Sequence, residues 1–196
     1  TGFKFIGEKI KESEETGVGT YLFGFEESYG YLKGTYARDK DAVVATMLIA
    51  EMTLYYREKG ISLSQQMENV YAKYGCYIEH VESVVMEGKD GVARIGSIME
   101  ELRNNPPKTV GGKAVTAVRD YKTSVRTELE SGKTEEILLP VSNVIYLEME
   151  GGSNFIIRPS GTEPKIKLYC LLRGENRTET EALVEAVKAD IENIVG

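Results

Sequence analysis

Hydrophobic positions in the first part of the chain follow mainly a helical period. Apolar residues recur every three or four positions in 42–59 and in 63–74, and a short polar helix is expected over 7–15. Because apolar side chains cover most of the circumference of 42–59, we expect that helix to be largely buried. Residues 20–25 are apolar or aromatic at nearly every position, which predicts a buried strand.

The second part of the chain is dominated by alternation of apolar and polar residues, which is typical of strands with one buried face. Strands are predicted over 77–87, 113–120, 143–150, 154–157 and 165–171. Helical spacing returns over 92–102 and in the C-terminal segment, where Thr178 and Glu181 form a capping-box pattern. The segment 121–139 is polar and has no clear period.

These patterns predict the fold class α/β plus α+β. Strands joined by turns, with two helices that each need one covered face, indicate a two-layer α+β domain with an antiparallel sheet in the second half. The first half has too few strands to close a sheet, so we expect it to be the C-terminal part of a three-layer α/β domain. A boundary near residues 74–76 gives domains 1–75 and 76–196, and the start at Thr1 suggests an excised piece of a longer protein.

Composition narrows the function classes. The 196 residues are 41% hydrophobic and 28% charged, as in ordinary globular proteins, and the net charge of −7 argues against a general nucleic-acid binder. We find no apolar run long enough to span a membrane and no signal peptide. The two cysteines, Cys76 and Cys170, lie far apart in sequence and are expected to be reduced thiols, which predicts a cytoplasmic location.

The segment 158–165, which reads Arg-Pro-Ser-Gly-Thr-Glu-Pro-Lys, connects two predicted strands. Its arginine offers a planar fork that fits a phosphate, and its hydroxyls and backbone N–H groups can form an anion-binding nest. The prolines stiffen both ends, while Gly161 permits a close backbone approach or a positive φ. The alternative is an ordinary hairpin connection with a surface arginine, but the combination of these residues favours phosphate.

A second polar segment follows the predicted strand 20–25. Glu26, Glu27 and Ser28 come where α/β sheets place ligand loops, and their side chains suit sugar hydroxyls. The alternative is a solvated acidic turn. In the next polar segment, Asp39 or Asp41 is expected to cap the helix that follows.

Three segments carry a resemblance to the α-D-phosphohexomutases, the phosphoglucomutase and phosphomannomutase superfamily. Residues 158–164 resemble the distal phosphate-binding loop of that family, and 25–30, Phe-Glu-Glu-Ser-Tyr-Gly, are similar to its sugar-recognition loop. Residues 1–4 and 38–41 resemble the segments before and after the sugar loop. The motifs occur in the family's order, so the resemblance covers essentially the whole chain.

The resemblance implies four domains around a cleft, of which this chain holds the end of domain 3 (1–75) and domain 4 (76–196). The substrate-binding residues that it implies are Glu26 and Ser28 for sugar hydroxyls, Arg158, Ser160, Gly161 and Thr162 for the phosphate that is not transferred, and Lys4 and Lys40 as cleft cations. The implied reaction interconverts hexose 1-phosphate and hexose 6-phosphate through a phosphoserine and a bisphosphate intermediate. The implied partners are a phosphorylated sugar and the missing N-terminal domains, with no nucleic acid and no membrane.

The sequence departs from the family pattern in two ways. It contains neither a Thr-Ala-Ser-His-Asn-Pro phosphoserine loop nor an Asp-Gly-Asp-Gly-Asp metal loop. We therefore expect no catalytic and no metal-binding residue in this chain, and we expect Mg²⁺ and a glucose 1,6-bisphosphate-type activator to act in the longer parent.

Alternatives to a phosphoglucomutase remain open at the level of sequence. The Glu-Glu-Ser-Tyr-Gly form of the sugar loop is closer to phosphoglucomutases, but phosphomannomutase and phosphopentomutase branches belong to the same superfamily. Because only binding residues are present, a non-enzymatic sugar-phosphate-binding module is the opposed hypothesis. A structural α+β interaction domain is the third, and it leaves the loop at 158–165 without a purpose.

Overall fold

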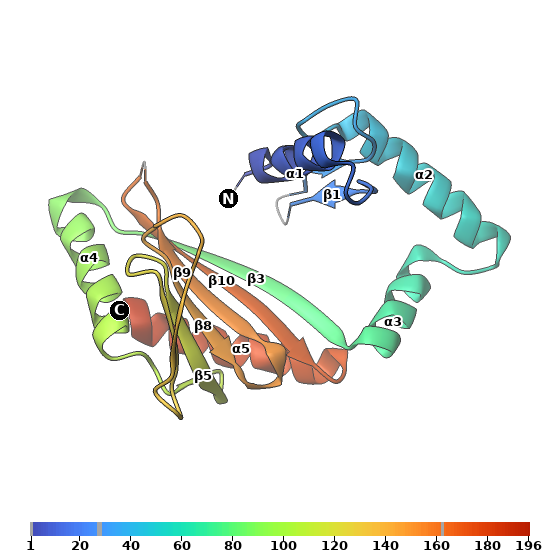
Figure 1. Ribbon diagram of the computed structural model, residues 1–196. Coiled ribbons are helices and arrows are strands. Elements are labelled where there is room, and N and C mark those ends of the chain that lie inside the picture. Colours follow the sequence, from blue (N-terminus) through green and yellow to red (C-terminus); the bar gives the residue numbers. More distant parts are fainter. Residues whose placement is uncertain (1, 27–28, 162) are drawn as a thin grey trace. The chain divides into compact units, whose positions relative to one another are not determined.

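The computed structural model describes residues 2–26, 29–161 and 163–196, and the chain divides into two compact units, 1–69 and 70–196 (Figure 1). Both helices and antiparallel strands are present, so the predicted mixed α/β and α+β fold class is confirmed. No helix among the described residues is long and apolar enough to cross a membrane. One helix, Leu63–Tyr74, spans the division between the units, and the domain boundary near residue 75 stays a prediction.

The first unit is formed by helices and one short hairpin. Its elements are α1 (Lys4–Thr16), β1 (Gly24–Phe25), β2 (Tyr31–Leu32), α2 (Ala42–Glu58) and the start of α3 (Leu63–Tyr74). The two strands pair antiparallel, and a small core gathers Phe3, Ile10 and Leu32. Asp41 caps α2, because its carboxylate accepts a hydrogen bond from the N–H of Val43 at 2.7 Å. It is one of the two residues that the sequence predicted as the cap.

Two expectations for this unit are wrong. The predicted strand 20–25 is reduced to Gly24–Phe25, and the side chain of Leu22 is 75% exposed. Helix α2 has no buried residue, and Met47 and Leu54 are each 58% exposed. An apolar strand or helix is buried only when neighbouring elements cover it, and within the described residues β1 pairs only with β2.

The second unit is a two-layer α+β structure built on an antiparallel sheet (Figure 1). Its strands are β3 (Cys76–Val85), β4 (Thr109–Val110), β5 (Lys113–Asp120), β6 (Val125–Glu128), β7 (Thr134–Glu136), β8 (Ile145–Met149), β9 (Asn154–Pro159) and β10 (Lys165–Gly174). Its long helices are α4 (Gly88–Asn104) and α5 (Arg177–Val195), with a short 3-10 turn at Glu150–Gly152. The strand order is β3-β10-β9-β8-β5-β6-β7, and β4 pairs with β5.

Strict alternation in the central strands builds the core of this unit. In β10, Ile166, Leu168, Cys170 and Leu172 are buried, and they join the buried faces of β8 and β9 and the apolar sides of α4 and α5 in one cluster. Burial raises the pKa of the Cys170 thiol to about 12, so this cysteine is a packing residue. The opposite face of the sheet carries the polar and half-exposed positions of the same strands.

Two local details differ from the sequence expectations. Helix α5 begins at Arg177 rather than after Thr178, because the side chain of Asn176 caps it by accepting from the N–H of Glu179 at 3.0 Å. The ambiguous segment 121–139 contains β6 and β7, which extend the sheet beyond β5. Polar composition concealed these strands, since all their residues are half-buried or exposed.

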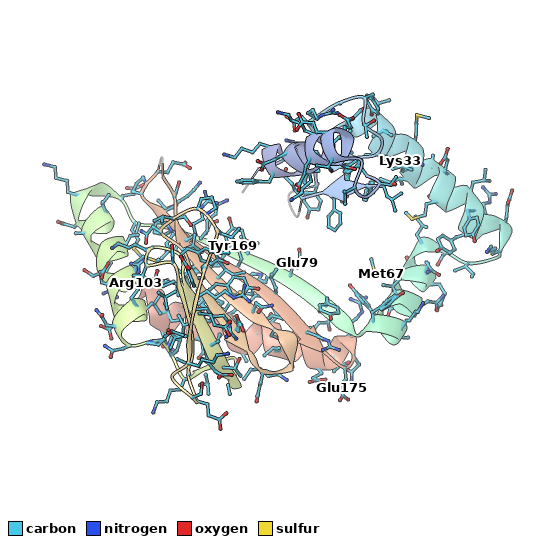
Figure 2. The ribbon with its side chains drawn as sticks, viewed as in Figure 1. Lys33, Met67, Glu79, Arg103, Tyr169 and Glu175 are labelled. Carbon is cyan, nitrogen blue, oxygen red and sulfur yellow. The ribbon has the colours of Figure 1, made fainter. Side chains whose placement is uncertain are left out.

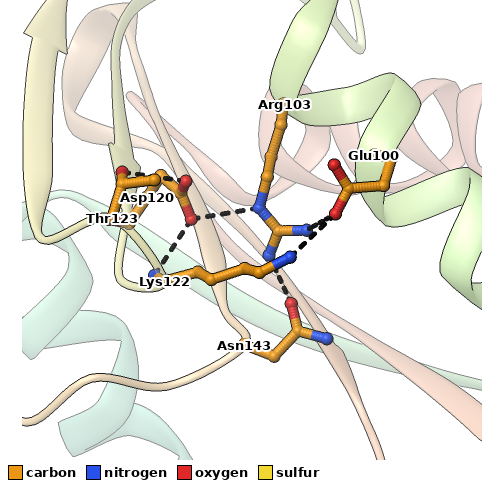
Figure 3. Close-up of polar contacts among 6 residues, drawn as sticks. All are labelled: Glu100, Arg103, Asp120, Lys122, Thr123 and Asn143. Atoms are coloured by element: carbon orange, nitrogen blue, oxygen red, sulfur yellow. Dashed lines mark hydrogen bonds and ion pairs between the residues drawn. The ribbon is translucent and has the colours of Figure 1, made fainter.

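A buried arginine connects α4 to the sheet (Figure 3). The Arg103 side chain is 9% exposed, and its Nε donates to the Oδ1 of Asp120 at the end of β5, 3.2 Å away. The same guanidinium donates to Glu100 at 3.1 Å and to the amide oxygen of Asn143, in the segment that leads into β8. The donor fork thus fixes the C-terminal end of α4 against two segments that are distant in sequence.

On the open face of the sheet, Glu148 of β8 binds two arginines. Arg126 donates to both carboxylate oxygens at 2.8 Å, and Arg119 donates at 2.5 Å. The hydrogen bond from Arg126 is the main cause that lowers the pKa of Glu148 to about 2. The Glu148 side chain is 19% exposed, so solvent screens this pair only partly.

We predict that Glu148→Gln lowers the free energy of unfolding at pH 7 by about 1–3 kcal/mol. The folded pKa lies below the unfolded value, so the contribution is fully present above pH 4.5 and disappears as the pH falls through about 2. Urea unfolding between pH 7 and pH 2 measures the difference, with the exposed Glu150→Gln as the matched control. An equal loss at every pH would assign the effect to packing and not to the charge.

Candidate functional site

The hairpin β9–β10 positions the predicted phosphate loop. Alternation places Ile157 of β9 and Leu168 of β10 in the core, so Arg158 and Lys167 are on the opposite, open face. These two cations are direct partners in the antiparallel register. Tyr169, which is labelled in Figure 2, is the next residue of β10 on that face.

Backbone hydrogen bonds close the base of the loop. The N–H of Ser160 donates to the carbonyl of Lys165 at 2.8 Å, and the N–H of Met86 donates to the carbonyl of Pro164 at 2.8 Å. The second bond attaches the loop to the segment between β3 and α4. Gly161 does not have the positive φ that was considered, and a Cβ there would meet nothing within 4 Å. The open space beside Gly161 leaves room for a close approach by a ligand.

Three cations and one carboxylate surround a hollow at this end of the hairpin. Its lining residues are Arg158, Pro159, Ser160, Glu163, Lys165 and Lys167, and its volume is about 170 Å³. Glu163 Oε2 lies 2.5 Å from Lys165 Nζ, and this hydrogen bond lowers the pKa of the Glu163 carboxyl below its ordinary value. A small hollow lined by a guanidinium, two ammonium groups and a hydroxyl suits a phosphate-sized anion.

The structure adds Lys165 and Lys167 to the residues expected from sequence. Both line the hollow beside Arg158 and Ser160, whereas Gly161 borders a second hollow of about 760 Å³ towards the first turns of α4. A signal for the two lysines is present in the sequence, because alternation through β10 puts both on the basic face. Thr162, the remaining residue expected here, lies outside the described residues.

The first unit contains the second candidate element. Lys40 Nζ lies 3.9 Å from Glu26 Oε2, and the Glu26 side chain is 18% exposed. Lys40 Nζ also donates to Asp39 Oδ1 at 2.7 Å. This hydrogen bond is the main cause that raises the pKa of Lys40, and the charge of Glu26 contributes less. The N–H of Glu26 donates to the carbonyl of Gly30 at 2.9 Å, which closes the loop that carries the expected sugar-binding residues.

Gly30 determines how Lys40 reaches Glu26. A Cβ at residue 30 would lie 2.1 Å from Lys40 Cδ and 3.3 Å from Glu26 Oε2, so any larger residue would displace the lysine. Sequence reasoning missed this role, since a close approach by a residue ten positions away leaves no local pattern. Ser28 lies outside the described residues.

Lys4 does not line the same hollow as the Glu26–Lys40 pair. It lines a separate hollow of about 600 Å³ with Phe5, Glu8, Lys11 and Arg38, and its ammonium lies 5.0 Å from the centre of the Phe5 ring. No group of three or more His, Cys, Asp or Glu side chains among the described residues could hold a metal ion.

Comparison with known proteins supports the same family over most of the chain. Residues 1–74 match the family described as "Phosphoglucomutase/phosphomannomutase, alpha/beta/alpha domain III". A phosphoglucomutase of Staphylococcus haemolyticus (strain JCSC1435) is 38% identical over 195 residues, which are 99% of this chain and 34% of the relative. A phosphoglucomutase of Staphylococcus aureus (strain MRSA252) is 41% identical over 174 residues, 88% of this chain and 31% of the relative.

A solved structure agrees in fold. The crystal structure of the exocytosis-sensitive phosphoprotein pp63/parafusin, a phosphoglucomutase from Paramecium in its open form, matches with a TM-score of 0.63. The match covers 98% of this chain and 32% of that chain at 14% identity, so it bears on the fold alone. The chain spans about a third of the length of the curated relatives that it matches. It belongs to the phosphoglucomutase/phosphomannomutase superfamily and corresponds to domain III residues and the segment that follows them.

Proposed function

We propose that this chain is the substrate-binding part of a phosphoglucomutase-type enzyme that interconverts hexose 1-phosphate and hexose 6-phosphate. The observation that carries the proposal is the small hollow where Arg158, Lys165, Lys167 and Ser160 meet on the open face of β9 and β10. Similarity to curated phosphoglucomutases over nearly the whole chain supports the choice of reaction.

In this proposal each unit supplies one binding element. The loop at 158–165 binds the phosphate that is not being transferred, with Arg158 as the charge-assisted anchor. In the first unit Glu26 accepts from sugar hydroxyls, and Lys40, whose Nζ lies 3.9 Å from Glu26 Oε2, orients that carboxylate. Ser28 and Thr162 belong to the same two elements by resemblance. Fixing the sugar phosphate in this way is catalysis by positioning.

The proposed reaction passes through a bisphosphate that must be bound in two orientations. Hydrogen bonds that Glu26 accepts from hydroxyls equivalent in both orientations satisfy that need, and the loop at 158–165 binds whichever phosphate is distal. Mg²⁺ and a bisphosphate activator belong to the proposed parent reaction. The described residues offer no fitting metal cluster, so we assign no ligand and no step to the metal in this chain.

The first prediction concerns the phosphate anchor. Arg158→Ala should weaken binding of inorganic phosphate by roughly 10- to 100-fold, since a bidentate charged hydrogen bond contributes roughly 1.5–3 kcal/mol. Arg158→Lys should recover only part, because an ammonium lacks the planar fork. Amide shifts during phosphate titration measure both, with the exposed Arg94→Ala of α4 as control. Wild-type binding by the alanine variant would remove this loop from the site.

The second prediction separates sugar from phosphate. Glu26→Gln should weaken binding of glucose 6-phosphate and leave inorganic phosphate unchanged, because the lost carboxylate accepts only from the sugar. The exposed Glu58→Gln at the end of α2 serves as control. Isothermal titration of both ligands gives the result. An equal loss for both ligands would indicate a folding effect, and melting curves of each variant test for that directly.

The third prediction concerns turnover. The chain alone should bind glucose 6-phosphate with a dissociation constant on the order of a millimolar, as expected for one phosphate held by a few donors. A coupled assay for interconversion of glucose 1-phosphate and glucose 6-phosphate, with Mg²⁺ and bisphosphate, should stay at background because the sequence has no phosphoserine loop. Turnover above background would require a phosphoryl carrier among residues that we assign to binding.

A further inference from the structure

The carboxylate of Glu163 lies inside the cationic hollow that we assign to phosphate. Glu163 lines the hollow together with Arg158, Lys165 and Lys167. Its Oε2 is 2.5 Å from Lys165 Nζ, and its side chain is 60% exposed while that of Lys165 is 23% exposed. The more exposed partner of the pair is therefore the anion, and the less exposed partner is the cation.

An incoming phosphate and the Glu163 carboxylate need the same donors. The hydrogen bond from Lys165 is the main cause of the lowered pKa of Glu163, and the charge of Lys167 lowers it further, so the carboxylate is ionised at neutral pH. Two negative charges about 4 Å apart in water repel each other enough to change an equilibrium constant roughly fivefold. A phosphate dianion in the hollow would be repelled more strongly, unless the carboxylate moves away.

The surroundings of Glu163 allow such a movement. Gly161 and Pro164, on either side of its segment, are exposed, and the loop is held by its base through the Ser160–Lys165 and Met86–Pro164 backbone bonds. Rotation of the exposed side chain therefore leaves those bonds intact. Lys165 Nζ has three donors and remains available once the carboxylate leaves.

We propose that Glu163 is an internal competitor of the phosphate: it occupies Lys165 while the loop is empty and is displaced when a phosphate binds. This inference rests on the proposed phosphate-binding role of the loop. Displacement lowers the affinity of the loop for phosphate and speeds its release. A mutase loop that must accept one phosphate and then another in each catalytic cycle gains from such weakened binding. Glu163 is thus a positioning residue that sets how long the distal phosphate stays.

A purely structural role for Glu163 predicts the opposite result. If the Glu163–Lys165 pair served only to order the loop, removing its charge would leave phosphate affinity unchanged or reduce it. If the carboxylate competes, removing its charge raises the affinity. Glu163→Gln keeps the shape and an acceptor for Lys165, so it separates the charge from the packing.

The test is a titration of the chain with inorganic phosphate at pH 7.5 and low ionic strength, followed by amide shifts, for wild type, Glu163→Gln and Glu163→Ala. We expect both variants to bind phosphate about three- to tenfold more tightly. In wild type labelled with ¹³C, the Glu163 carboxylate signal should move during the titration as it leaves Lys165. Raising the salt concentration should reduce the difference between the variants and wild type.

The matched control is Glu175→Gln, an exposed glutamate just after β10, at the end of the strand away from the loop, which should bind like wild type (Figure 2). Unchanged or weaker binding by Glu163→Gln, with an unchanged melting temperature, overturns the inference. Phosphate binding by Arg158→Ala shows whether the competitor role of Glu163 is wrong or the proposed phosphate-binding function of the loop is wrong. If that variant binds phosphate like wild type, or wild type binds none, the phosphate role of the loop itself is wrong.

Discussion

The alternation of β9 and β10 is the constraint on which the rest of the second unit depends. Because every second residue of these strands enters one core with α4 and α5, the intervening residues must lie on the opposite face. Arg158, Lys165 and Lys167 are such intervening residues. A shift of one residue in register would bury three cations, which is far more costly than any gain that the shifted core could offer. The same burial that stabilises the sheet therefore places the side chains of the candidate phosphate site on its open face.

Charge on that open face is organised in two different ways. At Glu148, both carboxylate oxygens accept from arginines, and Arg126 also pairs with Glu135 at 3.7 Å, so these charges form a contact within the sheet. At the end of the hairpin the cations outnumber the single carboxylate, Glu163, and the hollow they line is open to solvent. A group of cations that lines a hollow is suited to binding an anion, whereas arginines and carboxylates bonded to one another are suited to structure. This contrast supports placing the ligand at the loop.

The first unit explains where sequence reasoning failed. The apolar runs of 20–25 and of α2 were assigned to the interior because such runs are normally covered. Within the described residues they remain largely exposed, as Leu22 and Met47 illustrate. Periodicity indicates which surfaces need a neighbour, but the neighbour itself is a property of the assembled fold. A local feature such as the cap of α2 depends only on adjacent residues, and Asp41 is one of the two caps that the sequence predicted.

The sequence by itself determined the helices α2 to α5, the strands β3, β5, β8, β9 and β10, the class of the fold and the family, because these follow from local periods and contiguous motifs. It also identified Arg158 and Ser160 as candidates, although the roles of all site residues remain proposals. Alternation already placed Lys165 and Lys167 on the open face, but only the tertiary structure decided that they line the hollow beside Arg158, that Glu163 occupies Lys165, and that Gly30 makes room for Lys40. Each of these depends on distances between side chains across strands or loops, and such distances are set by register and packing, which no local pattern encodes.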